Sequence, residues 1–171
     1  EHATITSVIA GTKAVDLGQG WDREILIIDN CSTDGTREVL QQINDPEIKT
    51  FFHEQNMGKG MSIRTGIANM SGDYMIIQDA DAEYDPSEHI HFCRKADETN
   101  ADAIFGSRVL GGDVQYEYAH AYLGVRFLTA VTNILFGGHL TDVATATKMV
   151  RADVVQKLNL TTTDFNLDFE L

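Results

Sequence analysis

Short apolar runs alternate along the chain with longer segments in which apolar residues recur at helical spacing. The short runs are typical of buried strands, and the longer segments are typical of helices that cover a sheet. This pattern predicts helices over residues 3–14, 36–44, 59–70, 86–99, 118–136 and 152–158, and strands over 24–29, 49–53, 73–78, 102–106 and 148–151. The alternation favours an α/β domain with a mostly parallel sheet flanked by helices.

No internal repeat or low-complexity linker divides the sequence, and proline occurs only at Pro46 and Pro86. A length of 171 residues suits one domain with a core of ordinary size. We therefore expect residues 1–171 to form a single domain. Both ends are abrupt, since the chain opens inside a helical pattern and stops at residues 169–171 without a capping or turn signal. We expect the domain to be partial.

A net charge of −13 argues against nucleic acid as a partner, because binding to phosphates needs a basic face. It argues equally against simple electrostatic docking on anionic lipid. Cys31 and Cys93 make neither a disulfide framework nor a zinc site, and we expect free thiols of a reducing compartment. The chain opens without a signal segment, and no apolar stretch reaches the roughly 18 residues of a membrane span. We expect a cytoplasmic protein whose contact with a membrane, if any, is peripheral.

The acidic segment at residues 78–83, Gln-Asp-Ala-Asp-Ala-Glu, directly follows the apolar run at 74–77. Asp79 and Asp81 therefore stand at the end of a predicted strand, where ligands of parallel sheets bind. Mg²⁺ and Mn²⁺ take oxygen ligands and are commonly held by one or two carboxylates together with substrate phosphates. The segment predicts a metal–diphosphate site with Asp79 and Asp81 as ligands, and the alternative is a solvated acidic turn. None of the six histidines shows a metal-ligand spacing.

Two further segments carry polar groups suited to a nucleotide. Asp29 closes the strand 24–29, where a base or ribose would lie, ahead of a turn that caps the next helix. Gly58-Lys59-Gly60 opens a helix, and helix N-termini attract phosphates. The spacing differs from that of a P-loop, so a turn with a solvated lysine remains the alternative.

Three more charged residues are candidates on the C-terminal side. Arg108 follows the strand 102–106, where its guanidinium can fork onto a phosphate. Arg126 is the only full charge in the predicted helix 118–136, and it is either a surface arginine or a phosphate contact on the acceptor side. Asp142 follows a Gly-Gly turn and is either a loop carboxylate or a member of the site.

Five motifs occur in one order along the chain. They are Ile-Ile-Asp-Asn-x-Ser-Thr-Asp-Gly-Thr, Glu-x-Asn-x-Gly-Lys-Gly, Gly-Asp-Tyr-x-x-x-Gln-Asp-Ala-Asp-x-Glu-Tyr-Asp-Pro, Gly-Ser-Arg, and Thr-Asn-Ile-Leu-Phe-Gly with Leu-Thr-Asp-Val. The set resembles the inverting glycosyltransferases of family 2, and within them the dolichol-phosphate or polyprenyl-phosphate mannosyl- and glucosyltransferases. The resemblance implies a glycosyltransferase A fold, a nucleotide-sugar donor of the GDP-mannose or UDP-glucose type, a Mg²⁺ or Mn²⁺ ion, and inverting transfer to a polyprenyl or dolichyl phosphate at a membrane surface.

The resemblance, taken with the motifs, assigns a role to each candidate. Asp81, Arg108 and Asp142 are assigned to catalysis, Asp29, Lys59, Asp79 and Glu83 to the donor, Arg126 to the acceptor phosphate, and Asp79 and Asp81 to the metal. A phosphate acceptor is already a good nucleophile, whereas a sugar hydroxyl would need a general base, for which Asp142 or Glu83 would be the candidates.

The sequence departs from the family pattern at its start. A first strand ending in Pro-x-Tyr-Asn-Glu usually precedes the opening helix, and the sequence begins at what resembles the residue after that asparagine. A missing central strand leaves an exposed sheet edge, so self-association is expected. The alternatives are a non-catalytic remnant that binds nucleotide or metal weakly or acts as an interaction module, a family 2 transferase acting on a sugar hydroxyl, and a nucleotidyltransferase.

Overall fold

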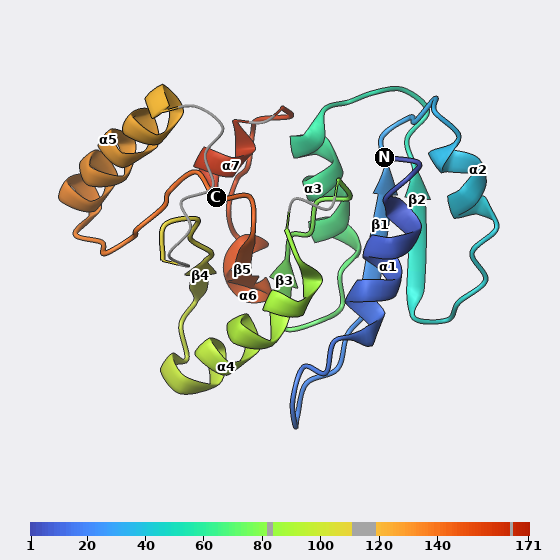
Figure 1. The fold of residues 1–171 in the computed structure, drawn as a ribbon, viewed down its shortest axis with the longest axis horizontal. Helices are drawn as coiled ribbons and strands as arrows, with labels where there is room; N and C mark the ends of the chain where they lie inside the picture. Colours follow the sequence, from blue (N-terminus) through green and yellow to red (C-terminus); the bar gives the residue numbers. More distant parts are fainter. Residues whose placement is uncertain (82–83, 111–118, 165) are drawn as a thin grey trace.

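A computed structural model describes residues 1–81, 84–110, 119–164 and 166–171 (Figure 1). Strands and helices alternate along the chain as the sequence predicts. In order they are α1 (Ile5–Ala14), β1 (Ile25–Asp29), α2 (Thr36–Gln41), β2 (Ile48–Phe52), α3 (Lys59–Asn69), β3 (Tyr74–Ile76), the short 3₁₀ helix η1 (Pro86–Glu88), α4 (His89–Thr99), β4 (Ala103–Phe105), α5 (Ala119–Phe136), β5 (Lys148–Arg151), α6 (Ala152–Val155) and α7 (Leu167–Glu170).

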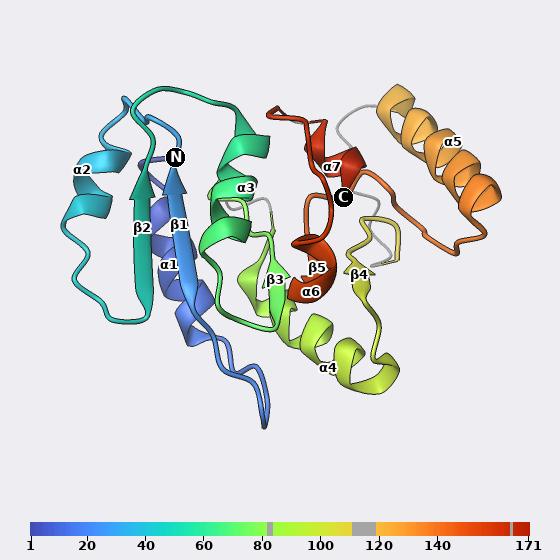
Figure 2. The same cartoon turned by 180° about the vertical axis from the view of Figure 1, so that it is seen from behind.

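The strands form two hydrogen-bonded groups. β1 and β2 pair in parallel, and β5 lies between β3 and β4, antiparallel to both. β3 and β4 therefore run in the same direction, and β5 is the strand that runs against them. Helices cover both faces of the strands. The helix α1 lies on the face turned to the viewer in Figure 1, and α3 lies on the face turned to the viewer in Figure 2. The predicted α/β fold with flanking helices is confirmed.

β5 is the strand around which the core is built. Successive side chains of a strand point to opposite faces. Met149 accordingly joins a cluster with Phe92 of α4, whereas Val150 joins a second cluster with Val155 and Leu167. Because both faces of β5 are covered, its first three residues are buried, with Met149 at 4% and Val150 at 2% exposure.

The strand β1 is covered less completely. Its four apolar residues are only partly buried, and within the described residues it is hydrogen-bonded to β2 alone. An unpaired strand edge is a template for pairing with another chain. Self-association through this edge stays a prediction, which light scattering at increasing protein concentration would test.

Two predicted helices end earlier than expected. The segment 36–44 is helical only to Gln41, and 152–158 only to Val155. Beyond each end the backbone tightens into turns with bonds to the third residue back, such as Ile43 N to Leu40 O at 3.2 Å and Leu158 N to Val155 O at 3.2 Å. The four-residue helix α7 was not predicted, because one turn is too short to show a period.

Candidate active site

The side chain of Gln78 links the described residues on the two sides of the acidic turn after β3. Its Nε2 donates to the carbonyl oxygens of Asp79 at 3.0 Å and Tyr84 at 2.9 Å, so it bridges both ends of the turn. Its Oε1 lies 3.0 Å from Nε2 of His89, which is 4% exposed. Burial lowers the pKa of His89, so the ring is neutral and its Nε2–H donates to Gln78. His89, which sequence reasoning left without a role, therefore supports the acidic turn.

Lys59 and Asp79 come from separate motifs and meet at the carboxyl end of β3. Lys59 is the first residue of α3, and its Nζ lies 3.0 Å from Oδ2 of Asp79. Their side chains keep 19% and 25% of their surface exposed, so the pair is accessible from solvent. Asp81 is exposed on the same turn. Glu83, also assigned to the donor, lies outside the described residues.

The acidic turn suits a metal ion that binds together with a diphosphate. Within the described ranges, no group of three or more His, Cys, Asp or Glu side chains is arranged to hold a metal ion. Asp79 and Asp81 nevertheless provide accessible carboxylate oxygens, which are the ligands Mg²⁺ and Mn²⁺ prefer. Since Mg²⁺ is usually bound by one or two carboxylates plus substrate phosphates, this donor set fits an ion that a diphosphate completes.

Asp29 lies at the end of β1, and its side chain is fully buried. Its Oδ1 accepts from the amide of Ser32 at 3.1 Å, and its Oδ2 lies 2.6 Å from Nε of Arg37. Burial raises the pKa of this carboxyl, but the hydrogen bonds from Ser32 and Arg37 outweigh burial and hold it below its usual value. In this arrangement Asp29 anchors Arg37, which also donates to the carbonyl of His53. Its contact with a nucleotide base stays a prediction.

Asn30, which follows Asp29, joins the first two motifs. Its Oδ1 accepts from the amide of Met57 at 2.9 Å, and its Nδ2 donates to Oδ1 of Asn56 at 2.9 Å. The ring nitrogen Nδ1 of His53 lies 3.0 Å from the same Asn30 oxygen. These bonds place the loop that leads into Gly58-Lys59-Gly60 beside the end of β1.

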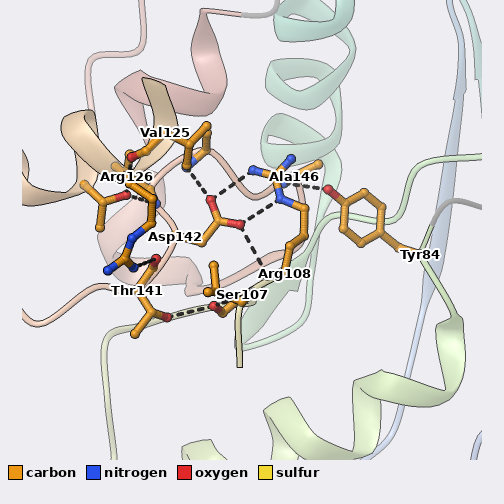
Figure 3. A network of polar contacts seen from close by, with 12 residues as sticks. Tyr84, Ser107, Arg108, Val125, Arg126, Thr141, Asp142 and Ala146 are labelled. Carbon is orange, nitrogen blue, oxygen red and sulfur yellow. Dashed lines mark hydrogen bonds and ion pairs between the residues drawn. The ribbon is translucent and has the colours of Figure 1, made fainter. Parts of the chain in front are cut away.

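Arg108 and Asp142, two of the predicted catalytic residues, form an ion pair (Figure 3). Nε of Arg108 lies 2.7 Å from Oδ2 of Asp142, and Nη2 lies 2.9 Å from Oδ1. The backbone amides of Arg108 and Ala144 also donate to this carboxylate, at 3.3 and 3.1 Å. Burial raises the pKa of Asp142, yet the bonds from Arg108 outweigh burial and lower it. The Asp142 side chain has no exposed surface.

Arg126 lies beside this pair, on α5. Its Nη1 is 3.5 Å from the carbonyl oxygen of Thr141, the residue before Asp142 (Figure 3). The Thr141 hydroxyl in turn donates to Oγ of Ser107 at 2.8 Å. Arg126 itself is exposed. The structure therefore brings three predicted residues together around the 141–144 loop.

Tyr84 connects the acidic turn to the segment that follows the 141–144 loop. Its hydroxyl oxygen accepts from the amide of Ala146 at 3.4 Å, so the end of the acidic turn touches the segment that leads into β5 (Figure 3). Asp29 takes part in neither group, since its hydrogen-bond partners are Ser32 and Arg37. The site therefore divides into a Lys59–Asp79 side and an Arg108–Asp142 side.

Apolar side chains cover much of α5 and face solvent. The helix is fastened to the body through Asn133, which exchanges two bonds of 2.8 Å with the backbone of Leu140, and through Thr129, whose hydroxyl accepts from Val143 N at 3.2 Å. Its exposed large apolar residues are Leu123, Phe127, Leu128, Ile134, Leu135 and Phe136, at 44–81% exposure. No helix in the described part of the chain is both long and apolar enough to cross a bilayer.

Comparison with known proteins decides the family. The profile of glycosyl transferase family 2 matches residues 2–158. The chain belongs to glycosyl transferase family 2. The resemblance stated from the five motifs is thereby confirmed.

Curated relatives of this family 2 chain include the undecaprenyl-phosphate 4-deoxy-4-formamido-L-arabinose transferases of Salmonella paratyphi A, Salmonella dublin and Salmonella enteritidis. Each is 34% identical over 103 residues, which is 57% of this chain and 31% of the relative. The match thus spans about a third of the length of these relatives.

The fold of the family 2 chain is similar to that of the mannosyltransferase PcManGT from Pyrobaculum calidifontis, solved in complex with GDP-Man and Mn²⁺. The TM-score is 0.65 at 15% identity, and the similarity covers 99% of this chain and 47% of that one. The glycosyltransferase A fold that the resemblance implied is confirmed.

Proposed function

We propose that the chain forms the donor site and reaction centre of a metal-dependent hexosyltransferase. Its donor is a nucleoside-diphosphate sugar of the GDP-mannose or UDP-glucose type, and its acceptor is a polyprenyl or dolichyl phosphate. The hexose is transferred with inversion at its anomeric carbon. Family membership supports glycosyl transfer, and the named activity of the Salmonella relatives supports a polyprenyl-phosphate acceptor.

The observation that carries the proposal is the meeting of Lys59 with the acidic turn. An ammonium 3.0 Å from Asp79, with Asp81 two residues further, places one cation and two carboxylates at the carboxyl end of β3. Ligands of such sheets bind at this edge. Asp79 and Asp81 would hold Mg²⁺ or Mn²⁺, and the ion would neutralise charge on the leaving nucleoside diphosphate. Lys59 would contribute a further positive charge there.

The geometry of Asp142 argues against this residue as the general base for a sugar hydroxyl, while Glu83, the other candidate, lies outside the described residues. A hydroxyl acceptor needs a general base with a free oxygen. Both oxygens of Asp142 accept hydrogen bonds, from Arg108 and Ala144, and the side chain is buried with its pKa lowered. Such a carboxylate is a poor base. A lipid phosphate is already ionised and can attack without one.

The acceptor would approach along α5. Its exposed apolar side chains, with Phe127 at 69% and Leu135 at 70%, suit a polyprenyl chain or the surface of the membrane that holds it. Arg126 lies on the same helix, beside the loop that carries Asp142. We infer that Arg126 and Arg108 bind the acceptor phosphate, because a guanidinium group can donate two parallel hydrogen bonds to the oxygens of one phosphate.

A transfer assay tests the proposed function. The protein is incubated with Mn²⁺, labelled GDP-mannose or UDP-glucose, and a short polyprenyl phosphate, and labelled lipid is then extracted. The expected product forms from one donor, disappears with EDTA, and is absent when polyprenol replaces polyprenyl phosphate. Asp81→Asn should abolish product formation, and Asp73→Asn is its matched control, because Asp73 precedes β3 at its opposite end.

Two other outcomes of this assay would each support one of the alternative functions. Label transferred to a sugar hydroxyl, with none on the lipid phosphate, would support a different family 2 acceptor. No transfer to either acceptor, from a protein that unfolds cooperatively, would support the non-catalytic remnant.

A further inference from the structure

The glycines at the start of α3 lie against a distant part of the chain. A Cβ on Gly60 would lie 2.8 Å from the Thr163 carbonyl carbon and 2.9 Å from the Asp164 oxygen, and one on Gly58 would lie 2.2 Å from Thr163 O. The amide of Met61 donates to that Thr163 oxygen at 3.1 Å. The glycine pair thus forms a notch in which residues 161–164, here called the strap, are seated.

The strap is held from its other side by Glu170 of α7. The two carboxylate oxygens accept from the amide and hydroxyl of Thr161, both at 2.8 Å, and from the amide and hydroxyl of Thr162, at 3.0 and 2.7 Å. Leu160 and Leu167, on either side of the strap, are buried in the same core cluster. Packing of Leu160 and Leu167 therefore holds the chain on both sides of the strap, and one carboxylate holds the first two strap residues.

We propose that Glu170 is a positioning residue for the donor site, which it orders through the strap and the first turn of α3. The contacts run from Glu170 to Thr162, from Thr163 to the Met61 amide, and from the first residue of α3, Lys59, to Asp79. Release of the strap frees the first turn of α3, which has no side-chain cap of its own. Lys59 then loses its fixed position opposite Asp79.

Gly58 and Gly60 therefore serve a different purpose from the one that their motif suggests. Sequence reasoning treated the glycines as part of a phosphate cradle, whereas they admit the backbone of the strap, and Thr163 takes up the Met61 amide. Of the three residues Gly58-Lys59-Gly60, only Lys59 remains a donor contact under the proposed function, on which the inference rests. The strap therefore sets how well that lysine is presented to a diphosphate.

Two pairs of variants test the inference by hydrogen exchange of the amides of residues 59–62. Glu170→Gln removes the charge and two of the acceptor positions, and Glu98→Gln is its control on an exposed face of α4. Gly60→Ala pushes a methyl group against the strap. Gly66→Ala, in the same helix, meets only Ile28 Cδ1 at an ordinary 3.6 Å. We expect amide exchange to accelerate about tenfold in Glu170→Gln and Gly60→Ala, and to stay unchanged in both controls. A tenfold change corresponds to the weakening of about one charge-assisted hydrogen bond.

The second readout is the affinity for GDP or UDP in the presence of Mn²⁺, which should fall about tenfold in the same two variants. Unchanged exchange at 59–62 in Glu170→Gln would overturn the inference, as would faster exchange with unaltered nucleotide affinity. Failure of the unmodified chain to bind any nucleotide would refute the proposed function instead. Exchange would then decide the ordering role of the strap by itself.

Discussion

Arg108 and Asp142 are joined by a two-point ion pair, with Nε–Oδ2 at 2.7 Å and Nη2–Oδ1 at 2.9 Å. The pair ties the loop after β4 to the loop before β5, at the point where Arg126 also contacts Thr141. Because Asp142 is enclosed, its main effect is to fix the guanidinium plane of Arg108. Under the proposed function, the carboxylate would support an arginine that binds the acceptor phosphate, and we expect the stability of the site to depend on it.

Asp142→Asn should lower the free energy of unfolding by about 2–3 kcal/mol, because the loss of one partner leaves buried donors unpaired. The value lies below the range for fully buried pairs, since 24% of the Arg108 side chain meets solvent. Urea unfolding followed by circular dichroism measures it. Asp102→Asn, in an exposed pair with Arg151, is the control and should change stability by less than about 0.5 kcal/mol. Equal effects of the two substitutions would argue against a buried pair.

His89→Ala should loosen the acidic turn. The substitution leaves Oε1 of Gln78 without its donor and should destabilise the fold by about 1–3 kcal/mol. It should also weaken Mn²⁺-dependent nucleotide binding, because Gln78 bridges the turn that carries Asp79. His91→Ala removes an exposed histidine of the same helix and should change neither quantity. A His89 variant that matches the His91 variant in both measurements would contradict this role.

The ionisation of Glu170 should make stability fall in acid. Hydrogen bonds from Thr162, first of all its hydroxyl, lower the pKa of Glu170 from 4.5 to about 2 in the folded chain. A carboxyl with a lowered folded pKa stabilises the fold above its unfolded pKa and loses that contribution as pH falls through its folded pKa. The loss attributable to Glu170 therefore lies between pH 4.5 and 2. Urea midpoints of the unmodified protein and of Glu170→Gln should converge across this window, and parallel curves would disprove the contribution.

The exposed face of α5 should bind neutral lipid surfaces. A net charge of −13 disfavours anionic membranes, so vesicles of phosphatidylcholine are the appropriate probe. Phe127→Ser should reduce co-sedimentation with these vesicles by about tenfold or more, since a buried phenylalanine contributes about 1.5–3 kcal/mol. Ala130→Ser, at an exposed position of the same helix, should have little effect. Equal binding of the unmodified protein and both variants would contradict a role of this face of α5 in lipid binding.

Sequence patterns predicted the elements well because most are apolar runs bounded by turn residues. They left out the direction of β5 and the existence of α7, since a four-residue strand carries no sign of its partner and a one-turn helix shows no period. Arg108 and Asp142 were both candidates from the sequence, but their pairing depends on contacts across 34 positions. His89 and Glu170 act on the site through neighbours, and no local motif marks such residues.

Calorimetric titration of GDP and UDP, with Mn²⁺ and then with EDTA, tests the central claim most directly. The account predicts that one nucleotide binds, that EDTA abolishes the binding, and that Asp81→Asn abolishes it while cooperative unfolding is retained. Asp73→Asn should bind as the unmodified protein does. Binding that persists in EDTA or in Asp81→Asn, or no binding of either nucleotide to a cooperatively folded chain, would contradict a metal–diphosphate site at the end of β3.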